Sequence, residues 1–213
     1  YNSEYNGTFD GGGHVVKNLR LDEKDRSLGL FGNVKNAVIK NVVVSGSIRG
    51  RHSFLGGIVG KSYGKTTISG CGNLMDITNE KNSGSAGGII ATSDSTVNVS
   101  DCFNRGDIKS EGRASGIVAD ASFGTVENCY NTGSIEGEKA IGIGSAFFIS
   151  YKSCYNAGKI SSKSSVTPYS IGGSKLSEYA DTYYMQGLAQ GDPASRSKEI
   201  SKEEMASISF VET

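Results

Sequence analysis

The sequence predicts an all-β fold, a right-handed parallel β-helix of about seven rungs that ends in a short capping helix. Three observations predict it: a segment that recurs every 23 to 31 residues, glycine-bracketed apolar stretches between the copies, and a composition rich in Gly, Ser, Asn, Val and Ile. The 30 glycines among 213 residues are about twice the usual share of roughly 7%. Such a composition is typical of short strands and tight turns. Successive parallel strands are expected to wind right-handed.

The repeat is centred on one small apolar position. The clearest copies read Cys-aromatic-Asn-x-Gly-x-Ile and begin at Cys102, Cys129 and Cys154. We call this position the cysteine column; its predicted members are Leu19, Val42, Cys71, Cys102, Cys129, Cys154 and Thr182. Because Leu, Val and Cys all bury well, we expect the column to point into the core as a ladder of thiols. Disulfides between neighbouring rungs remain an alternative. A zinc site is disfavoured, since the sequence contains no Cys-x-x-Cys pair.

Each unit is predicted to hold three short strands. The first is a glycine-bracketed apolar segment such as Gly87–Ile90, and the second ends at the cysteine column. The third carries an isoleucine six residues after the column position; these isoleucines are Ile48, Ile77, Ile108, Ile135 and Ile160. The Asn-x-Gly between the second and third strands is typical of a corner in the left-handed conformation. Stacked Asn104, Asn131 and Asn156 can also hydrogen-bond from rung to rung.

The two ends of the repeat array differ in character. Residues 1–192 are predicted to form the solenoid and residues 193–213 a C-terminal cap. Ser201 and Glu204 have the spacing of a capping box, which predicts a short helix near 201–207. Apolar side chains at Met205, Ile208, Phe210 and Val211 would pack this helix over the last rung, which would cover its open edge. A frayed linker is the alternative for this segment.

Bulk properties exclude several function classes. Lys and Arg together number 22, as do Asp and Glu, so no net charge favours nucleic acid or an anionic membrane. No apolar run approaches the roughly 20 residues that span a bilayer, so we expect no membrane insertion in this chain. The first ten residues show no signal-peptide pattern, and we expect the chain to be part of a longer protein.

The sequence shows no catalytic, cofactor or metal motif. The glycine run from Asp10 to His14 lacks the Lys-Ser/Thr ending of a phosphate-binding loop and reads as a turn. No Ser/His/Asp set has a recognisable spacing. Asp94, Asp101 and Asp120 can meet in space, but their spacing does not resemble a calcium loop. We therefore predict no catalytic residues, no cofactor and no metal.

An aromatic residue follows the cysteine column in four copies. We call Phe103, Tyr130, Tyr155 and Tyr183 the aromatic column. If the cysteines face inward, strict alternation places these rings outward, where they can form a platform for a sugar or a protein. The alternative is a purely structural stack, turned inward by a bulge at the corner.

These segments together resemble the GLUG-motif repeats of bacterial surface proteins. The resemblance is carried by Gly7–His14 followed by Val-Lys-Asn-Leu19, by Gly29-Leu-Phe-Gly32, and by the later Gly-Gly-Ile-Val-Gly copies. It implies an extracellular setting, on a bacterial surface or secreted. Such repeats occur in adhesin-like proteins and beside the catalytic region of immunoglobulin-A-specific metallopeptidases. The His-Glu-x-x-His signature of such a peptidase is absent from this sequence.

The sequence thus favours a non-catalytic extracellular module that serves adhesion or acts as a spacer. Its expected partners are host or microbial glycans or proteins, and we expect a monomer. The alternatives are a carbohydrate-active β-helix enzyme and an accessory region of a surface metallopeptidase.

Overall fold

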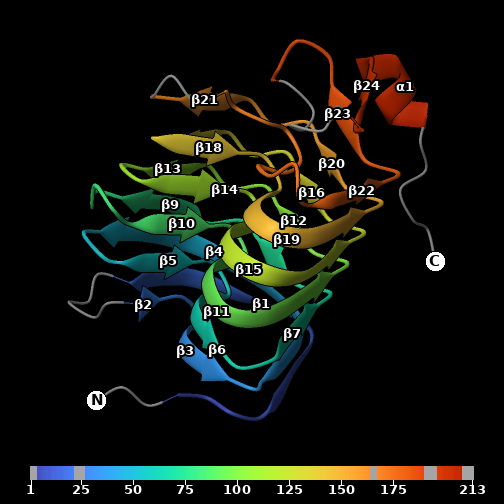
Figure 1. The fold of residues 1–213 in the computed structure, drawn as a ribbon. Helices are drawn as coiled ribbons and strands as arrows, with labels where there is room; N and C mark the ends of the chain where they lie inside the picture. Colours follow the sequence, from blue (N-terminus) through green and yellow to red (C-terminus); the bar gives the residue numbers. More distant parts are fainter. Residues whose placement is uncertain (1–3, 22–26, 164–166, 190–195, 208–213) are drawn as a thin grey trace.

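The protein is a parallel β-solenoid of about six turns. The computed structural model describes residues 4–21, 27–163, 167–189 and 196–207. Its rungs stack from β1 at one end to β24 and the single described helix, α1, at the other (Figure 1). This confirms the predicted all-β class.

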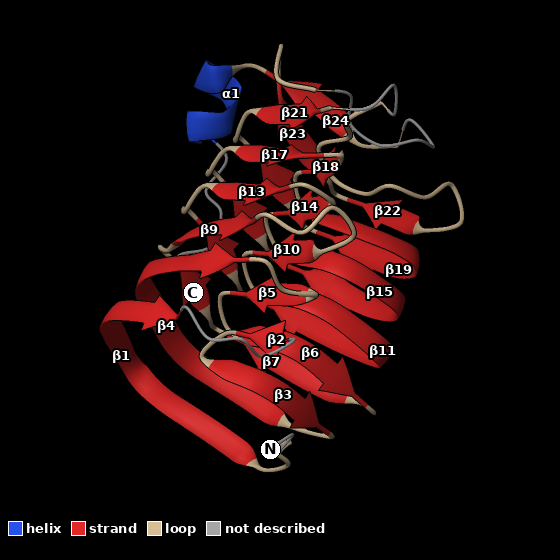
Figure 2. Cartoon of the chain, turned by 90° about the vertical axis from the view of Figure 1, so that its left-hand side faces the viewer, coloured by secondary structure: helices blue, strands red, loops and turns tan. Residues whose placement is uncertain are grey.

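The rungs align four columns of strands, seen from the side in Figure 2. The long strands and their pieces are β1 (Thr8–Leu21), β3 (Phe31–Lys35), β4 (Val38–Gly50), β6 (Val59–Tyr63), β7 (Thr66–Ser69), β11 (Ile90–Ser100), β15 (Val118–Glu127), β19 (Gly144–Lys152) and β22 (Glu178–Ala180). A second column of short strands holds β8 (Gly72–Asn73), β12 (Phe103–Asn104), β16 (Tyr130–Asn131), β20 (Tyr155–Asn156), β23 (Tyr183–Met185) and β24 (Lys198–Ile200). A third holds β9 (Asp76–Asn79), β13 (Ile108–Ser110), β17 (Ile135–Gly137) and β21 (Ile160–Ser162). The fourth is a separate five-stranded parallel sheet of β2 (Ser27–Leu28), β5 (Phe54–Gly56), β10 (Ser85–Gly87), β14 (Arg113–Ser115) and β18 (Lys139–Ile141).

The glycine-bracketed apolar segment is a bend and not a strand of its own, so the prediction of three strands per unit was wrong. In the third full rung, β10 ends at Gly87 and β11 begins at Ile90, with Gly88 and Ile89 in the bend between them. The glycine is needed because a Cβ on Gly88 would meet the carbonyl oxygen of Gly116 and the side chain of Asn104. A tight bend at this point separates each strand of the five-stranded sheet from the long strand that follows it.

The cysteine column points inward, as predicted. All four cysteines are buried and free, so the thiol ladder is confirmed over the alternative of disulfides. The residue after the column position pairs in register from rung to rung, in the order Gly72, Phe103, Tyr130, Tyr155 and Tyr183. The column residues that precede them therefore lie one above another. Each thiol donates to the carbonyl oxygen two residues earlier, at 3.0–3.3 Å.

Leu19 does not belong to the cysteine column, which is a correction to the prediction. In the register of β1 with β4, Leu19 pairs with Gly46, whereas Val42 pairs with His14. The cause is two register shifts in β1, between Asp10 and His14 and between Val16 and Leu19. The column therefore runs from Val42 to Thr182 with six members, which agrees with about six turns instead of the predicted seven.

Isoleucines of the third column form a second inward ladder. Successive residues pair in register and each is at most 5% exposed; they are Ile48, Ile77, Ile108, Ile135 and Ile160. A third ladder on the long strands ends in two tyrosines, Tyr151 and Tyr179, whose ring centroids lie 5.4 Å apart. The Tyr151 hydroxyl donates to the Gly144 carbonyl at 2.9 Å, so this buried polar group is satisfied. The core is thus a set of columns that run along the rod.

Asparagines two residues after the cysteine column form a buried ladder, as predicted, and Asn73 extends it. Each side-chain amide donates to the Oδ1 of the next asparagine at 2.7 Å, in the order Asn73, Asn104, Asn131 and Asn156. Each amide also donates to the carbonyl two residues ahead, at 2.8–2.9 Å. Ser170 ends the ladder, with its Oγ 3.5 Å from Asn156 Nδ2. Both amide protons of every asparagine in the ladder are used.

The left-handed corner lies at a different residue from the one predicted. The Asn-x-Gly glycines do not adopt a positive φ; Gly133 is needed because a Cβ there would meet the carbonyl oxygen of Gly106 in the preceding rung. Positive φ occurs one residue before the cysteine column, at Asn41, Gly70, Asp101, Asn128, Ser153 and Asp181. Asn, Asp and Gly are the residues that tolerate this conformation best, which explains five of the six choices.

The C-terminal helix is present as α1 (Lys202–Ser207), and its capping box is formed. Ser201 Oγ accepts from the Glu204 amide at 3.1 Å, and Glu204 Oε2 accepts from the Ser201 amide at 2.8 Å. The strand before it, β24, pairs with β23, so one strand of the stack lies within the predicted cap. Three of the apolar residues predicted to pack the cap, Ile208, Phe210 and Val211, lie outside the described residues, and the boundary between 192 and 193 stays a prediction.

Candidate functional site

The aromatic column lies on the outer side of β12, β16, β20 and β23. Its rings are half-buried, whereas the residues on either side of the first three rings, such as Cys102 and Asn104 beside Phe103, are fully buried. Phe103 and Tyr130 stack with ring centroids 5.4 Å apart, and Tyr130 and Tyr155 with centroids 5.1 Å apart. Tyr183 pairs with Tyr155 in the register. The alternation of strand side chains thus turns the rings outward, without the inward bulge that was the alternative.

Cations cover parts of this column. The guanidinium carbon of Arg105 lies 5.1 Å from the Phe103 centroid and 5.7 Å from that of Tyr130, within the range of a cation–π contact. Its Nη2 also donates to the Tyr130 hydroxyl at 2.8 Å. Lys198 Nζ lies 5.7 Å from the Tyr183 centroid. Burial and the neighbouring Tyr130 raise the pKa of Tyr155 to about 12.

The stacking decides what the aromatic column offers to a ligand. Within the stack each ring face is covered by the next ring, so the rings present their edges and hydroxyls outward. Edges and hydroxyls suit hydrogen bonds and edge contacts with a protein or glycan. They do not offer the open ring face on which a sugar would lie flat.

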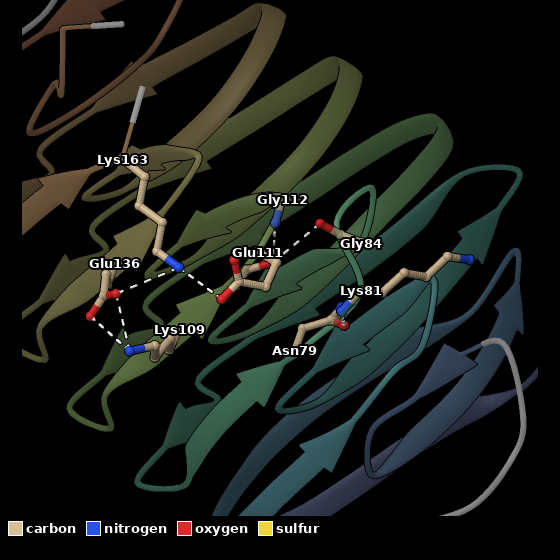
Figure 3. Close-up of polar contacts among 9 residues, drawn as sticks. Asn79, Lys81, Gly84, Lys109, Glu111, Gly112, Glu136 and Lys163 are labelled. Carbon is tan, nitrogen blue, oxygen red and sulfur yellow. Dashed lines mark hydrogen bonds and ion pairs between the residues drawn. The ribbon is translucent and has the colours of Figure 1, made fainter. Parts of the chain in front are cut away.

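Charged side chains on the neighbouring face pair with one another. Lys109 Nζ lies 3.1 Å from Glu136 Oε1, and Lys163 Nζ lies 2.7 Å from Glu111 Oε1 and 3.8 Å from Glu136 Oε1 (Figure 3). These residues come from successive rungs, where opposite charges alternate. Exposed pairs of this kind contribute little stability and leave no net charge for a ligand. The surface matches the solvated face that mixed charges indicate.

A groove that the sequence did not reveal runs beside the five-stranded sheet, mostly along the first residues of its strands. It consists of two hollows that share Arg113 and Lys139. The larger, of about 380 Å³, is lined by Phe54, Asn82, Ser83, Ser85, Gly112, Arg113, Asp120, Glu138 and Lys139. The smaller, of about 220 Å³, we call the cationic pocket; it is lined by Arg113, Lys139, Ala140, Ile141, Ser145, Phe147, Thr167, Tyr169, Gly173 and Ser174.

Asp120 is the most perturbed carboxylate of this groove. It forms an ion pair with Arg113. Burial raises the pKa of Asp120 above its ordinary value, although Arg113 acts in the opposite direction. The nearby charge of Asp94 also raises it, so two of the three aspartates expected to meet do lie near one another. The third, Asp101, accepts instead from Asn128 Nδ2 at 3.1 Å on another part of the rod.

The residues that line the groove are of types that bind ligands. Among the residues that the structure describes, no three His, Cys, Asp or Glu side chains are placed to hold a metal ion. Likewise, none of the described helices is long and apolar enough to cross a membrane. The lining joins cations, carboxylates, hydroxyl-bearing residues and aromatic rings, so the groove places polar groups beside apolar ones, as ligand sites do.

The sequence did not indicate this groove because only some of its residues recur at equivalent positions of the repeat. Arg113 and Lys139 pair in register on β14 and β18, but Phe147 and Tyr169 come from the last, less regular rungs. The signal that was available is the pair of cations at equivalent positions of two copies, before Ala114 and Ala140.

The fold defines this chain as a parallel β-solenoid with outward aromatic and cationic surfaces. No protein-family model matches the chain, and no curated protein matches it by sequence. Among solved structures, it is similar to a protein of Bacteroides ovatus described as a putative immunoglobulin A1 protease. The likeness has a TM-score of 0.72 and covers 94% of this chain and 70% of that one, at 20% identity. At this identity it shows the shared fold alone, and the resemblance to GLUG repeats stays a prediction.

Proposed function

We propose that this chain is a non-catalytic module of an extracellular bacterial protein, where it acts as a monomer in adhesion and holds its ligand through the aromatic column. The observation that carries the proposal is the outward stack of Phe103, Tyr130 and Tyr155, with Arg105 over two of its rings. A continuous strip of ring edges and hydroxyls on a rigid rod fits a glycan or protein partner.

Two further observations support a bacterial surface setting. The repeats resemble those of surface proteins, and the similar solved structure comes from a bacterium and carries the name of a protease. The same name favours a second candidate function, in which this solenoid is an accessory region beside a peptidase domain. In both candidates the solenoid binds and positions a partner, and it carries out no chemistry itself.

Binding to a panel of host matrix proteins, immunoglobulins and glycans tests the proposal. The expected result is saturable binding to at least one member, weakened about tenfold or more by Tyr155→Ala, which corresponds to about 1.4 kcal/mol. The matched control is Phe123→Ala, which removes an exposed ring, stacked on Phe148 at 5.5 Å, from outside the aromatic column.

Circular dichroism must show both variants folded as β structure. Folded parent protein that binds nothing would refute the adhesive role. Equal weakening by both variants would refute the assignment of binding to the aromatic column.

A further inference from the structure

The cationic pocket has an unbalanced charge. The described residues that line it include Arg113 and Lys139 but no Asp or Glu. Arg113 is shared with Asp120 in the adjoining hollow, where their charges cancel. Lys139 is exposed and forms no ion pair with any of the described residues, although its charge acts on Asp120 at longer range. Asp120 and Glu138 line only the larger hollow, so within the cationic pocket itself the two cations face no carboxylate of the described residues.

An aromatic ring and several hydroxyls complete the pocket. Phe147 is 56% exposed, so much of its ring is open to solvent. Unlike the rings of the aromatic column, it appears in no stacked pair within the described part of the chain, although the adjacent Phe148 does. Three residues that carry hydroxyl groups, Ser145, Tyr169 and Ser174, belong to the same lining.

This combination selects a ligand class. A cation recognises a carboxylate, an uncovered ring accepts the apolar C–H face of a sugar, and hydroxyls exchange hydrogen bonds with those of a sugar. At about 220 Å³ the cavity is smaller than the range of roughly 300–1,000 Å³ that holds drug-sized ligands, so it suits one monosaccharide unit. A bare phosphate would leave the ring without a partner.

We infer that the cationic pocket binds a carboxylated sugar unit, a uronic or a sialic acid, within a larger glycan. The carboxylate contacts Lys139 and Arg113, and the sugar ring lies against Phe147. This inference rests on the proposed function, in which the chain binds a ligand, but it assigns that ligand to a second surface and names its class.

Calorimetric titration of the folded chain with defined oligosaccharides tests the inference. The acidic probes are trigalacturonate and sialyllactose, and the neutral counterparts are maltotriose and lactose; the two acids separate the uronic from the sialic source. We expect one acid to bind about tenfold or more tightly than its neutral counterpart. Inorganic phosphate serves as a test for simple anion binding.

Two variants and one control locate the site. Lys139→Glu should reduce binding of the acidic probe at least about tenfold, and Phe147→Ala should weaken it without removing the preference for acid. The matched control is Lys159→Glu, which makes the same charge change at an exposed lysine on another part of the rod. The inference is overturned if acidic and neutral probes bind alike, if phosphate competes as well as the acid, or if Lys139→Glu binds like the parent.

The two variants Tyr155→Ala and Lys139→Glu distinguish failure of this inference from failure of the proposed function. Panel binding that is sensitive to Tyr155→Ala and insensitive to Lys139→Glu would support the aromatic column and refute the pocket. Acid-specific binding that is sensitive only to Lys139→Glu would support the pocket and refute the aromatic column as the ligand site.

Discussion

Single side chains set the register of this rod through contacts that only one residue type permits. The asparagine ladder faces a column of glycines across the rung, in which Gly88, Gly116 and Gly142 each lie against an asparagine side chain. Any Cβ in that glycine column would occupy space taken by the ladder and by a backbone carbonyl. Hydrogen bonding and close approach therefore reinforce one another at the same level of each rung.

Gly116→Ala tests this coupling. The added Cβ would meet the carbonyl oxygen of Gly142 and the side chain of Asn131, so we expect a loss of about 1–3 kcal/mol in the free energy of unfolding. Urea denaturation measures it, with exposed Ser122→Ala as the control. A variant as stable as its parent would show that the rungs are not packed this closely.

Cys129→Asp tests the inward direction of the cysteine column. Burial already raises the pKa of the Cys129 thiol well above its ordinary value, and an unpaired carboxylate there should cost several kcal/mol or prevent folding. The control is Cys129→Val, because Val42 fills the same column; it should stay within about 1.5 kcal/mol of the parent. A melting temperature of the Asp variant equal to that of the parent would mean that the position faces solvent.

The raised pKa of Tyr155 predicts that the folded protein loses stability at alkaline pH. Its pKa is about 12 in the folded protein, against about 10 in an unfolded chain. Between these two values the unfolded state loses a proton that the folded state keeps, so stability falls as pH rises through this window and is unaffected below it. Tyr155→Phe should therefore lose less stability than the parent between about pH 9 and pH 11. Tyr63→Phe is the control, and identical losses in all three proteins would contradict the assignment.

At the scale of the elements, corners and caps determine where strands begin and end. The positive-φ residue before the cysteine column is Asn, Asp or Gly in every described rung except one, where it is Ser153 at φ 51°. An asparagine at this corner can also form a hydrogen bond between rungs: the Asn128 side chain donates to Asp101 in the preceding rung at 3.1 Å. Ser153 has the same backbone conformation without this contact.

Ser153→Asn should therefore stabilise the protein. We expect a gain of about 0.5–1 kcal/mol, since Asn tolerates the left-handed conformation better and can bond along the column. The midpoint of urea unfolding measures it. Ser150→Asn, within β19, is the control and should give no gain; a Ser153 variant that gains nothing either would show that this corner is not strained.

In a repeat protein, the sequence alone shows which residues occupy the same position in successive repeat units. The cysteine and isoleucine columns, the asparagine ladder and the capping box were all predictable, because the same residue type returns at the same place. Leu19 was misplaced because Val-Lys-Asn-Leu looks like the later copies, whereas the register shifts of β1 depend on its backbone. Bends were taken for strands for a related reason: Gly-Gly-Ile is apolar in composition, but the close approach of Gly116 to Gly88 is visible only in space.

The candidate site was predictable in part. The aromatic column recurs in four successive rungs and was found, and its stacking and its contacts with Arg105 required the structure. The groove was missed because Phe147 and Tyr169 have no equivalents in the earlier rungs, so no periodicity marks them. Function on a solenoid can therefore lie where the repeat becomes irregular.

At the scale of the whole molecule, the rungs form a rod with a regular core, and the proposed binding surfaces lie on its outside. Each rung contacts only its neighbours, so stability accumulates along the axis and outward residues can change at little cost. Such a scaffold suits a module that presents a ligand site at a distance from other domains. The same scaffold can host catalysis, and Asp120, with its raised pKa, is the residue on which an enzymatic alternative would depend.

Product analysis after prolonged incubation tests the central claim, that this module binds without catalysis, most directly. The folded chain is incubated with acidic polysaccharides and immunoglobulins, and both bound and free fractions are analysed by mass spectrometry. The account predicts that ligand is recovered intact from the bound fraction, for the parent and for Asp120→Asn alike. Cleaved sugar or peptide products that the parent releases and Asp120→Asn does not would contradict it and establish an enzyme.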